Sequence, residues 1–183
     1  VMDYVTIASA GNATDFGDAN VARGFMGSGG ASNGTRGVTG GGELDSGLTD
    51  SIEYITIANT GNGTDFGNLS AAKDDLTICS NTTRGIFFGG RTSDAINVIE
   101  FITIANTGNV TDFGDMTVAK QSHAGASNNT RGVFGGGELA DGSRTNVIEY
   151  ITVATAGDSA DFGDLTLDER KDLAAVSSPT RAV

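Results

Sequence analysis

The sequence predicts an all-β fold, a β-propeller built from four-stranded antiparallel blades. Two observations predict it. The triplet Asp-Phe-Gly recurs at Asp15, Asp65, Asp112 and Asp161, at intervals of 50, 47 and 49 residues. Repeats of this length are typical of propellers and repeat arrays, which copy one supersecondary unit. Glycine is abundant, with 28 Gly against one Pro, and Ile, Val, Thr and Tyr recur in short blocks, as expected of many short strands joined by tight turns.

The third repeat indicates the four strands of one blade most clearly. Asn128-Asn129-Thr130 is a turn signal between the first two strands, and a glycine run from Gly135 to Gly137 ends the second. A polar loop and a block rich in Ile, Val, Thr and Tyr follow. The expected strands are residues 118–127, 131–134, 146–154 and 161–165.

The third strand of each repeat predicts a sheet that is covered on both faces. In residues 52–58, Ile52 and Tyr54 lie on one face, while Ile55 and Ile57 lie on the other. A sheet with one wet face should instead alternate apolar with polar residues. Blades stacked between neighbours need two apolar faces, so the pattern favours stacked blades.

The turns between strands divide into constant and variable ones. The turn between the third and fourth strands is nearly constant, Gly followed by Asn or Asp, which suits a tight hairpin. The loop between the second and third strands varies over residues 43–50, 91–96 and 138–145. Because variable loops usually carry the binding surface of a repeat protein, we expect ligand contacts from Glu43, Asp45, Arg91, Asp94, Glu138, Asp141 and Arg144.

Residues 1–183 are predicted to form a single propeller domain of four repeats of about 49 residues. The sequence begins at the third strand of a repeat and ends within the second strand of another. If the ring closes, four blades result, and the N- and C-terminal strands share the last one, which brings the termini together and leaves no free edge. Two alternatives stay open: a fragment of a longer repeat protein, and two chains that pair into one ring, a homo-oligomer.

The charge balance disfavours two classes of partner. The net charge is −12, from 23 acidic and 11 basic residues, and such a field repels phosphate backbones and anionic lipid. No apolar run approaches the length of a membrane span, so we expect neither nucleic-acid binding nor membrane insertion. We expect no cofactor. Calcium is the one candidate ion, through Asp18, Asp115 and Asp164, but their spacing matches no calcium-binding loop.

Residues present in every repeat are interpreted as structural. The phenylalanines are expected between blades, and the arginines and aspartates are expected to form ion pairs that lock one blade to the next. The alternative is a ring of arginines that binds an anion at a pore. The residues concerned are Asp15, Phe16, Arg36, Asp65, Phe66, Arg84, Asp112, Phe113, Arg131, Asp161, Phe162 and Arg181.

Two residues that occur once have ordinary structural interpretations. His123 stands where other repeats have Met26, Leu76 and Leu173, so a packed histidine is expected and not a catalyst. Cys79, the sole cysteine, stands at a small apolar strand position, so we expect it to be buried and inert.

The glycine runs resemble those of kelch-type propeller repeats. Val38–Gly42, Ile86–Gly90 and Val133–Gly137 are similar to the kelch strand that ends in a glycine doublet, and Tyr54, Phe101 and Tyr150 follow them. Where kelch repeats carry Trp, this chain has Phe 12 residues after each of these aromatics, which makes it a divergent relative. The unit Ile-Glu-Tyr-Ile-Thr-Ile-Ala with a downstream Thr-Asp-Phe-Gly-Asp also resembles repeats of structural and tail proteins of marine bacteriophages.

Three functions follow as hypotheses. The first is a non-catalytic binding module of a phage virion or other extracellular assembly, which recognises a glycan or protein through the variable loops. No Trp occurs in the chain and no aromatic residue lies in those loops, so carbohydrate recognition lacks its usual signature. The second is a purely structural propeller without a small ligand. The third, a glycan-cleaving enzyme, is placed last because residues unique to one repeat do not assemble a catalytic set.

Overall fold

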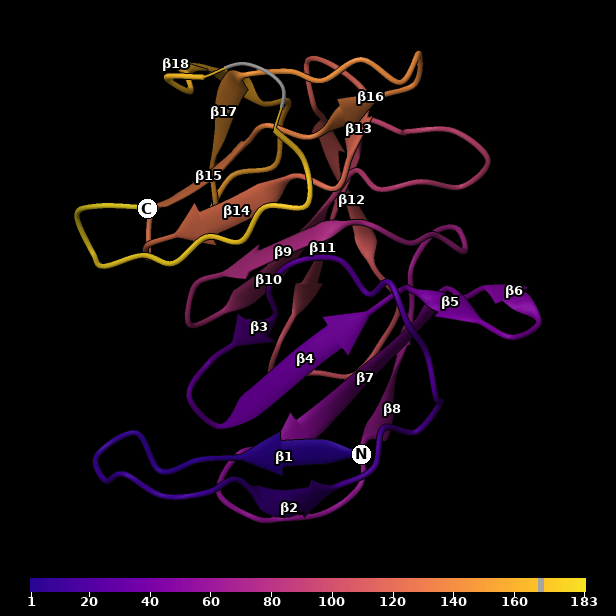
Figure 1. Ribbon diagram of the computed structural model, residues 1–183, viewed down its shortest axis with the longest axis vertical. Helices are drawn as coiled ribbons and strands as arrows, with labels where there is room; N and C mark the ends of the chain where they lie inside the picture. The colour runs from indigo at the N-terminus through magenta and orange to yellow at the C-terminus, as the bar shows by residue number, and fades with distance from the viewer. Residues whose placement is uncertain (168–169) are drawn as a thin grey trace.

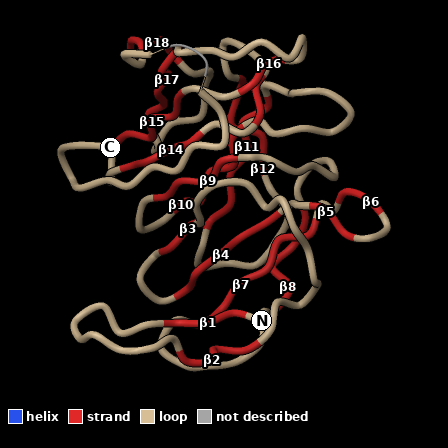
Figure 2. Tube along the Cα trace, in the orientation of Figure 1, coloured by secondary structure: helices blue, strands red, loops and turns tan. Residues whose placement is uncertain are grey.

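The computed structural model describes residues 1–167 and 170–183, and within them the chain contains strands and loops but no helix (Figure 2). No helix in this part of the chain therefore offers the length and apolarity of a membrane span. Three four-stranded antiparallel sheets follow one another along the longest axis, in the order of the chain (Figure 1). The all-β class and the four-stranded antiparallel sheets are thereby confirmed.

Each sheet is an up-and-down meander made from one stretch of the repeat pattern, and we call the three sheets I, II and III. Sheet I contains β3 (Ala31–Ser32), β4 (Arg36–Gly40), β7 (Ser51–Thr56) and β8 (Thr64–Asn68). Sheet II contains β9 (Thr77–Ser80), β10 (Arg84–Phe88), β11 (Val98–Thr103) and β12 (Thr111–Asp115). Sheet III contains β14 (Ala124–Ser127), β15 (Arg131–Gly135), β17 (Val147–Thr152) and β18 (Ala160–Asp164).

Three two-stranded pairs accompany the sheets. The N-terminal hairpin pairs β1 (Met2–Tyr4) with β2 (Thr14–Gly17), next to sheet I. Two smaller pairs lie among the loops: β5 (Glu43–Leu44) with β6 (Gly47–Leu48), and β13 (Lys120–Gln121) with β16 (Glu138–Leu139).

The third repeat corrects one detail of the prediction. The expected first strand, residues 118–127, is broken at Ser122, which has a φ of 53°. The residues before the break leave sheet III as β13, because their partner is β16 in the loop after the second strand. Part of the loop over residues 138–145 is therefore paired, while β15, β17 and β18 lie within two residues of the strands expected there.

Successive sheets approach closely at the glycine of each Asp-Phe-Gly triplet. A Cβ added at Gly67 would lie 2.2 Å from the carbonyl oxygen of Gly108, and one at Gly114 would lie 2.5 Å from the carbonyl carbon of Gly157. Both triplet glycines also have positive φ, 145° and 144°, which L side chains rarely adopt. The glycine thus lets the fourth strand of one sheet touch the turn of the next sheet, backbone to backbone.

The cores lie between the sheets, as predicted. Phe66 and Phe113 are each 2% exposed and Phe16 is 8% exposed, and each ring meets the aromatic residue of its neighbouring strand edge to face. The fourth phenylalanine departs from the expectation. Phe162 is 51% exposed, because no further sheet of the described residues covers the outer face of sheet III.

The stack of sheets is open, so the expected meeting of the termini does not occur in this structure. The N-terminal hairpin lies beside sheet I, and the C-terminal segment lies beside sheet III at the other end of the stack (Figure 1). No strand pairing in the described residues joins residues 1–17 to residues 174–183. The sheets pack mainly on their neighbours in the chain, and Ser28 Oγ also donates to the His123 carbonyl at 3.0 Å, which joins the segments that enter sheets I and III. These contacts do not bring the two ends together.

Candidate functional site: the loop rim

The variable loops emerge on one side of the stack, together with the segments that join one sheet to the next. In an antiparallel meander the first strand begins and the second strand finishes at the same end of the sheet. The loop after the second strand therefore lies beside the segment that enters the first. In Figure 1, β5, β6 and β16 lie on this side, and the turn between β1 and β2 lies on the opposite side. We call this side the loop rim. It comprises residues 18–28, 41–50, 69–76, 89–97, 116–123, 136–146, 165–167 and 170–173.

Backbone pairing ties each variable loop to the entering segment. Gly24 and Glu43 exchange two N–H···O bonds of 2.9 Å. Asp74 and Arg91 do the same at 3.0 and 2.9 Å in the second repeat, and β13 pairs with β16 in the third. The rim is therefore an ordered surface that repeats three times, and not a set of free loops.

The predicted ligand contacts separate into exposed and structurally engaged residues. Arg91 binds Asp74 through two hydrogen bonds, with 3.0 Å between Nε and Oδ1, and the Asp74 side chain is fully buried. Glu138 accepts hydrogen bonds from Lys171 at 2.7 Å and Gln121 at 3.0 Å, and the Lys171 bond is the main reason why the pKa of Glu138 lies below its usual value. The residues that face solvent on the rim are Glu43, Asp45, Asp94, Asp141 and Arg144.

A row of equivalent residues crosses the middle of the rim. Phe25, Asp75, Ser122 and Asp172 have φ values of 47°, 51°, 53° and 56°. The Asp75 N–H donates to the Phe25 carbonyl at 3.1 Å. The Ser122 N–H donates to the Asp75 carbonyl, and the Asp172 N–H donates to the Ser122 carbonyl, each at 2.9 Å. Positive φ is uncommon for residues other than glycine and tends to cluster at functional sites. The sequence analysis missed this row, because backbone strain leaves no signal in residue type here.

The row lines a hollow of about 380 Å³ that combines an aromatic ring with oxygen acceptors. Phe25 is 66% exposed, and Asp75, Ser122 and Asp172 bring carboxylate and hydroxyl oxygens to the same hollow. Burial and the neighbouring Asp74 carboxylate raise the pKa of Asp75, against the opposing effects of Arg91 and of a hydrogen bond with Ser122. The hollow therefore offers a stacking surface beside hydrogen-bond acceptors.

Buried ion pairs fix the segments that enter each sheet. Glu53, Glu100 and Glu149, one on each third strand, are at most 3% exposed. Each binds a cation of the rim: Arg23 at 2.7 Å, Lys73 at 2.6 Å and Lys120 at 2.5 Å. Each Glu also accepts a backbone N–H three residues before that cation, from Asn20, Ser70 and Thr117. Glu recurs at one position in the third strand of sheets I, II and III. This sequence signal could have predicted the buried ion pairs, but the sequence analysis did not include it.

The arginines and aspartates that recur in each repeat do not form the expected ion pairs. Arg36 donates to the carbonyls of Ile104 and Ala105 at 3.1 and 2.8 Å, and Arg84 donates to that of Val153 at 2.9 Å. The arginines thus link one sheet to the next through carbonyl oxygens. The aspartates are exposed and absent from the salt bridges of the described chain; they are Asp15, Asp65, Asp112 and Asp161.

These arginines also stack on aromatic rings, which leaves the alternative anion-binding ring without support. The guanidinium carbon lies 4.4 Å from the ring centroid for Arg36 over Tyr54, Arg84 over Phe101 and Arg131 over Tyr150. Arg181 belongs to the C-terminal hairpin, where its backbone pairs with Ser178. Contacts within and between sheets account for the placement of the first three guanidinium groups.

His123 and Cys79 are enclosed. His123 is 1% exposed, and neither ring nitrogen has a hydrogen-bond partner in the described chain. Burial, followed by the charge of Lys120, lowers the pKa of His123 to about 3. Burial raises the pKa of the Cys79 thiol to about 12, so this thiol stays protonated and unreactive. Over the same residues, no group of three or more His, Cys, Asp or Glu side chains is placed to hold a metal ion.

Comparison with known proteins adds no assignment. No protein-family model matches the chain, and no curated protein matches it. The likenesses to kelch repeats and to phage structural proteins therefore depend only on the residues quoted for them.

Proposed function

We propose that the chain is a non-catalytic binding module that recognises a surface ligand, a carbohydrate in preference to a protein, at the loop rim. One observation carries the proposal: the exposed Phe25 ring shares a hollow with Asp75 and Asp172. Sugar rings present apolar C–H faces and rows of hydroxyl groups, which match an aromatic platform flanked by oxygen acceptors. The exposed Glu43 and Asp45 supply further acceptors near the edge of the rim.

The fold proposed with this function is a kelch-like β-propeller of four blades, which requires the N- and C-terminal hairpins, separate in this structure, to come together as the last blade. The three stacked sheets of equivalent strand order support it. The proposed setting is a phage virion or another extracellular assembly, and its support is the resemblance of the Ile-Glu-Tyr-Ile-Thr-Ile-Ala unit to phage repeats.

A purely structural scaffold is the second candidate, and a specific observation favours it. Two residues predicted to contact ligand, Arg91 and Glu138, are already engaged in ion pairs within the rim. A rim that serves only to hold sheets in place would show such pairs. An enzyme is the third candidate. His123 and Cys79 are buried and inert, so a glycan-cleaving activity would depend on paired carboxylates.

A glycan array, probed with and without calcium, tests the proposal. Phe25→Ala removes the stacking surface and should reduce binding at least tenfold for any glycan that the unsubstituted chain captures. Phe162→Ala is the matched control, because Phe162 is also exposed but belongs to sheet III, away from the rim. Uniform silence of the intact chain would favour the scaffold, and release of new reducing ends from a bound glycan would favour the enzyme.

A further inference from the structure

The two ends of the stack carry complementary halves of one further sheet. In the N-terminal hairpin, Asp3 pairs with Asp15 and Tyr4 with Thr14, after an irregularity between Met2 and Asp3. Sheet I has the same register and the same irregularity between its third and fourth strands. The N-terminal hairpin therefore corresponds to the outer pair of strands, the third and fourth, of a complete sheet.

The C-terminal segment corresponds to the inner pair of strands, the first and second, of a complete sheet. Val176 and Val183 exchange two N–H···O bonds of 3.0 Å, and Ser177 forms a bridge with Ala182. The equivalent residues of sheet II pair in the same register, Cys79 with Ile86 and Ser80 with Gly85. Together the two hairpins supply the four strands of one complete sheet.

The contact between sheets II and III shows what such an outer strand packs against. Ile151 and Val153 of the third strand are 2% and 0% exposed, and they belong to one core cluster with residues of sheet II. Between sheets I and II, Ile102 and Ile104 lie in the same way, at 2% and 0%. The residues of sheet II in the first contact are Cys79, Ile86, Ile99 and Phe113.

In the N-terminal hairpin, the equivalent apolar side chains are uncovered. Val5 and Ile7 occupy the positions of Ile151 and Val153, and they are 57% and 99% exposed. An almost fully exposed isoleucine, at a position that is sealed in two other repeats, marks a surface without its partner.

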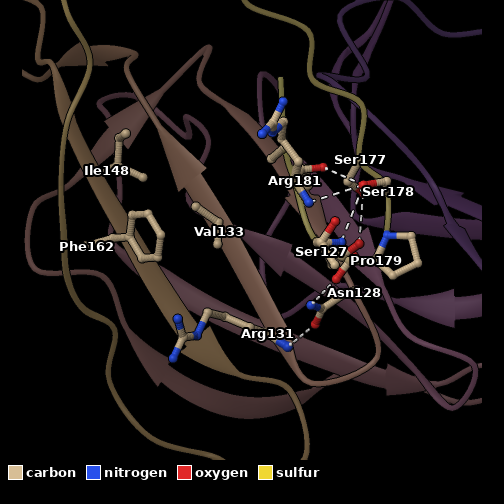
Figure 3. A pocket seen from close by; sticks show the side chains of 13 residues that line it. Ser127, Asn128, Arg131, Val133, Ile148, Phe162, Ser177, Ser178, Pro179 and Arg181 are labelled. Carbon is tan, nitrogen blue, oxygen red and sulfur yellow. Dashed lines mark hydrogen bonds between the residues drawn. The ribbon is translucent and has the colours of Figure 1, made fainter.

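The receiving surface is also present and open. The equivalents of the sheet II residues line a groove of about 400 Å³ on the outer face of sheet III, with the C-terminal segment along its other side. Figure 3 shows Val133, Ile148 and Phe162 on one side of this groove and Ser177 to Arg181 on the other. The residues at the four equivalent positions are Ala126, Val133, Ile148 and Phe162.

The polar groups of the two ends are complementary as well. Asp115 N–H donates to the Asp158 side chain across the contact of sheets II and III at 3.0 Å, and the equivalent pair is Asp164 with Asn12. Gly157 N–H donates to the Phe113 carbonyl at 2.6 Å, and Gly11 is placed in the sequence to do the same with Phe162.

Charged residues at the two ends also correspond to pairs that form contacts within sheet III. Asp3 occupies the position of the buried Glu149, and Arg170 occupies that of Lys120, its partner in sheet III. Tyr4 and Arg181 correspond to the stacked pair Tyr150 and Arg131. Both pairs are divided between the two ends of the stack.

We propose that the outer face of sheet III binds the N-terminal hairpin, β1–β2, of a second copy of this chain. In this structure the hairpin of the same chain lies beside sheet I at the opposite end of the stack, so the groove of one copy is open to the hairpin of another (Figure 1). The contact is head-to-tail, and a pair of chains that exchanges two such contacts closes without a free edge. This inference concerns the ends of the stack and is independent of ligand binding at the rim.

Sedimentation velocity of the intact chain over a range of micromolar concentrations tests the proposal. We expect a mass above the 18.5 kDa of one chain that rises with concentration. Ile7→Asp places a charge in the contact and should raise the dissociation constant at least tenfold. Val118→Asp is the matched control, because Val118 is 44% exposed on the rim and should leave the mass unchanged.

A mixing experiment separates contact between copies from closure within one chain. Ile7→Asp leaves the groove intact, and Phe162→Asp leaves the hairpin intact, and both substituted side chains are exposed. Each variant alone should sediment as a single chain, and their mixture should regain a two-chain species through the one contact that remains whole. A single-chain mass for the unsubstituted protein at every concentration, or association that survives both substitutions, overturns the proposal.

Discussion

Lys73 Nζ lies 2.6 Å from Glu100 Oε2, and the two side chains are 0% and 1% exposed. The pair joins the rim segment before β9 to the third strand of the same sheet. Glu100 also accepts the N–H of Ser70 at 3.0 Å, so one carboxylate holds two points of that segment. Because the arrangement recurs at Glu53 and Glu149, the loop rim is anchored by buried charge in each described sheet.

Loss of one partner of this pair should be costly. Lys73→Met leaves the Glu100 carboxylate buried without its cation, and we expect a loss of about 3–5 kcal/mol in the free energy of unfolding. Lys171→Met is the control, because Lys171 is 34% exposed in its pair with Glu138, and its loss should cost about 1 kcal/mol or less. Urea unfolding followed by fluorescence or circular dichroism measures both. Equal losses in the two variants would contradict the buried role of Lys73.

The aromatic position of the repeat offers an internal comparison. Phe113→Ala empties a site that is 2% exposed between sheets II and III, so we expect a cost of about 3–5 kcal/mol. Phe162→Ala changes the equivalent residue where it is 51% exposed, and should cost about 1 kcal/mol or less. The measurement is urea unfolding at a low protein concentration, which limits contact between copies. A large loss at Phe162 under these conditions would mean that its face is covered within the single chain.

The glycine of the triplet permits a similar comparison. Alanine at Gly114 would meet the backbone of Gly157 at 2.5 Å, whereas alanine at Gly163 would meet nothing within 4 Å. Both positions have positive φ, 144° and 138°, so backbone strain is common to the two variants. Gly114→Ala should therefore lose more stability than Gly163→Ala, by about 1–3 kcal/mol for the overpacked contact. Similar thermal midpoints for the two variants would show that the sheets separate freely at this point.

The strands and the inter-sheet cores could be predicted because each depends on a local or periodic signal. The Asp-Phe-Gly spacing places Phe66 and Phe113 at equivalent points of successive sheets, and that equivalence is what buries them. The relative placement of the ends could not be predicted in this way. Closure depends on how each sheet is set against the next, and small differences in packing add up along a stack.

The rim shows the same limit at the level of single residues. The variable loops were found by comparison between repeats, but Phe25 and Asp75 were not, because their shared feature is a left-handed backbone. Arg84 was expected to link one sheet to the next through an aspartate. It does link the two sheets, but its partner is the carbonyl oxygen of Val153. A guanidinium group carries five N–H donors, whose hydrogen bonds can be accepted by carbonyl oxygens as well as by carboxylates, and only the packed sheets place the carbonyl of Val153 within its reach.

The buried His123 should make the protein sensitive to acid. Its pKa lies at about 3 in the folded chain against a usual 6.5, chiefly because burial disfavours the charged ring. A depressed folded pKa contributes stability that is fully present above pH 6.5 and is lost as the pH falls toward 3. At pH 5 the loss from this residue alone should be about 2 kcal/mol relative to pH 7.

His123→Leu tests this directly, because the second and fourth repeats have Leu76 and Leu173 at the equivalent position. The variant lacks the titrating ring, so its free energy of unfolding should fall less than that of the parent between pH 7 and pH 5, by the same amount. Urea unfolding at the two pH values gives the comparison. Glu149, whose pKa is lowered because hydrogen bonds from Lys120, Thr117 and Ser159 outweigh the effect of burial, titrates in both proteins and cancels from it. Parallel losses in parent and variant would show that the imidazole is reached by water in the folded chain.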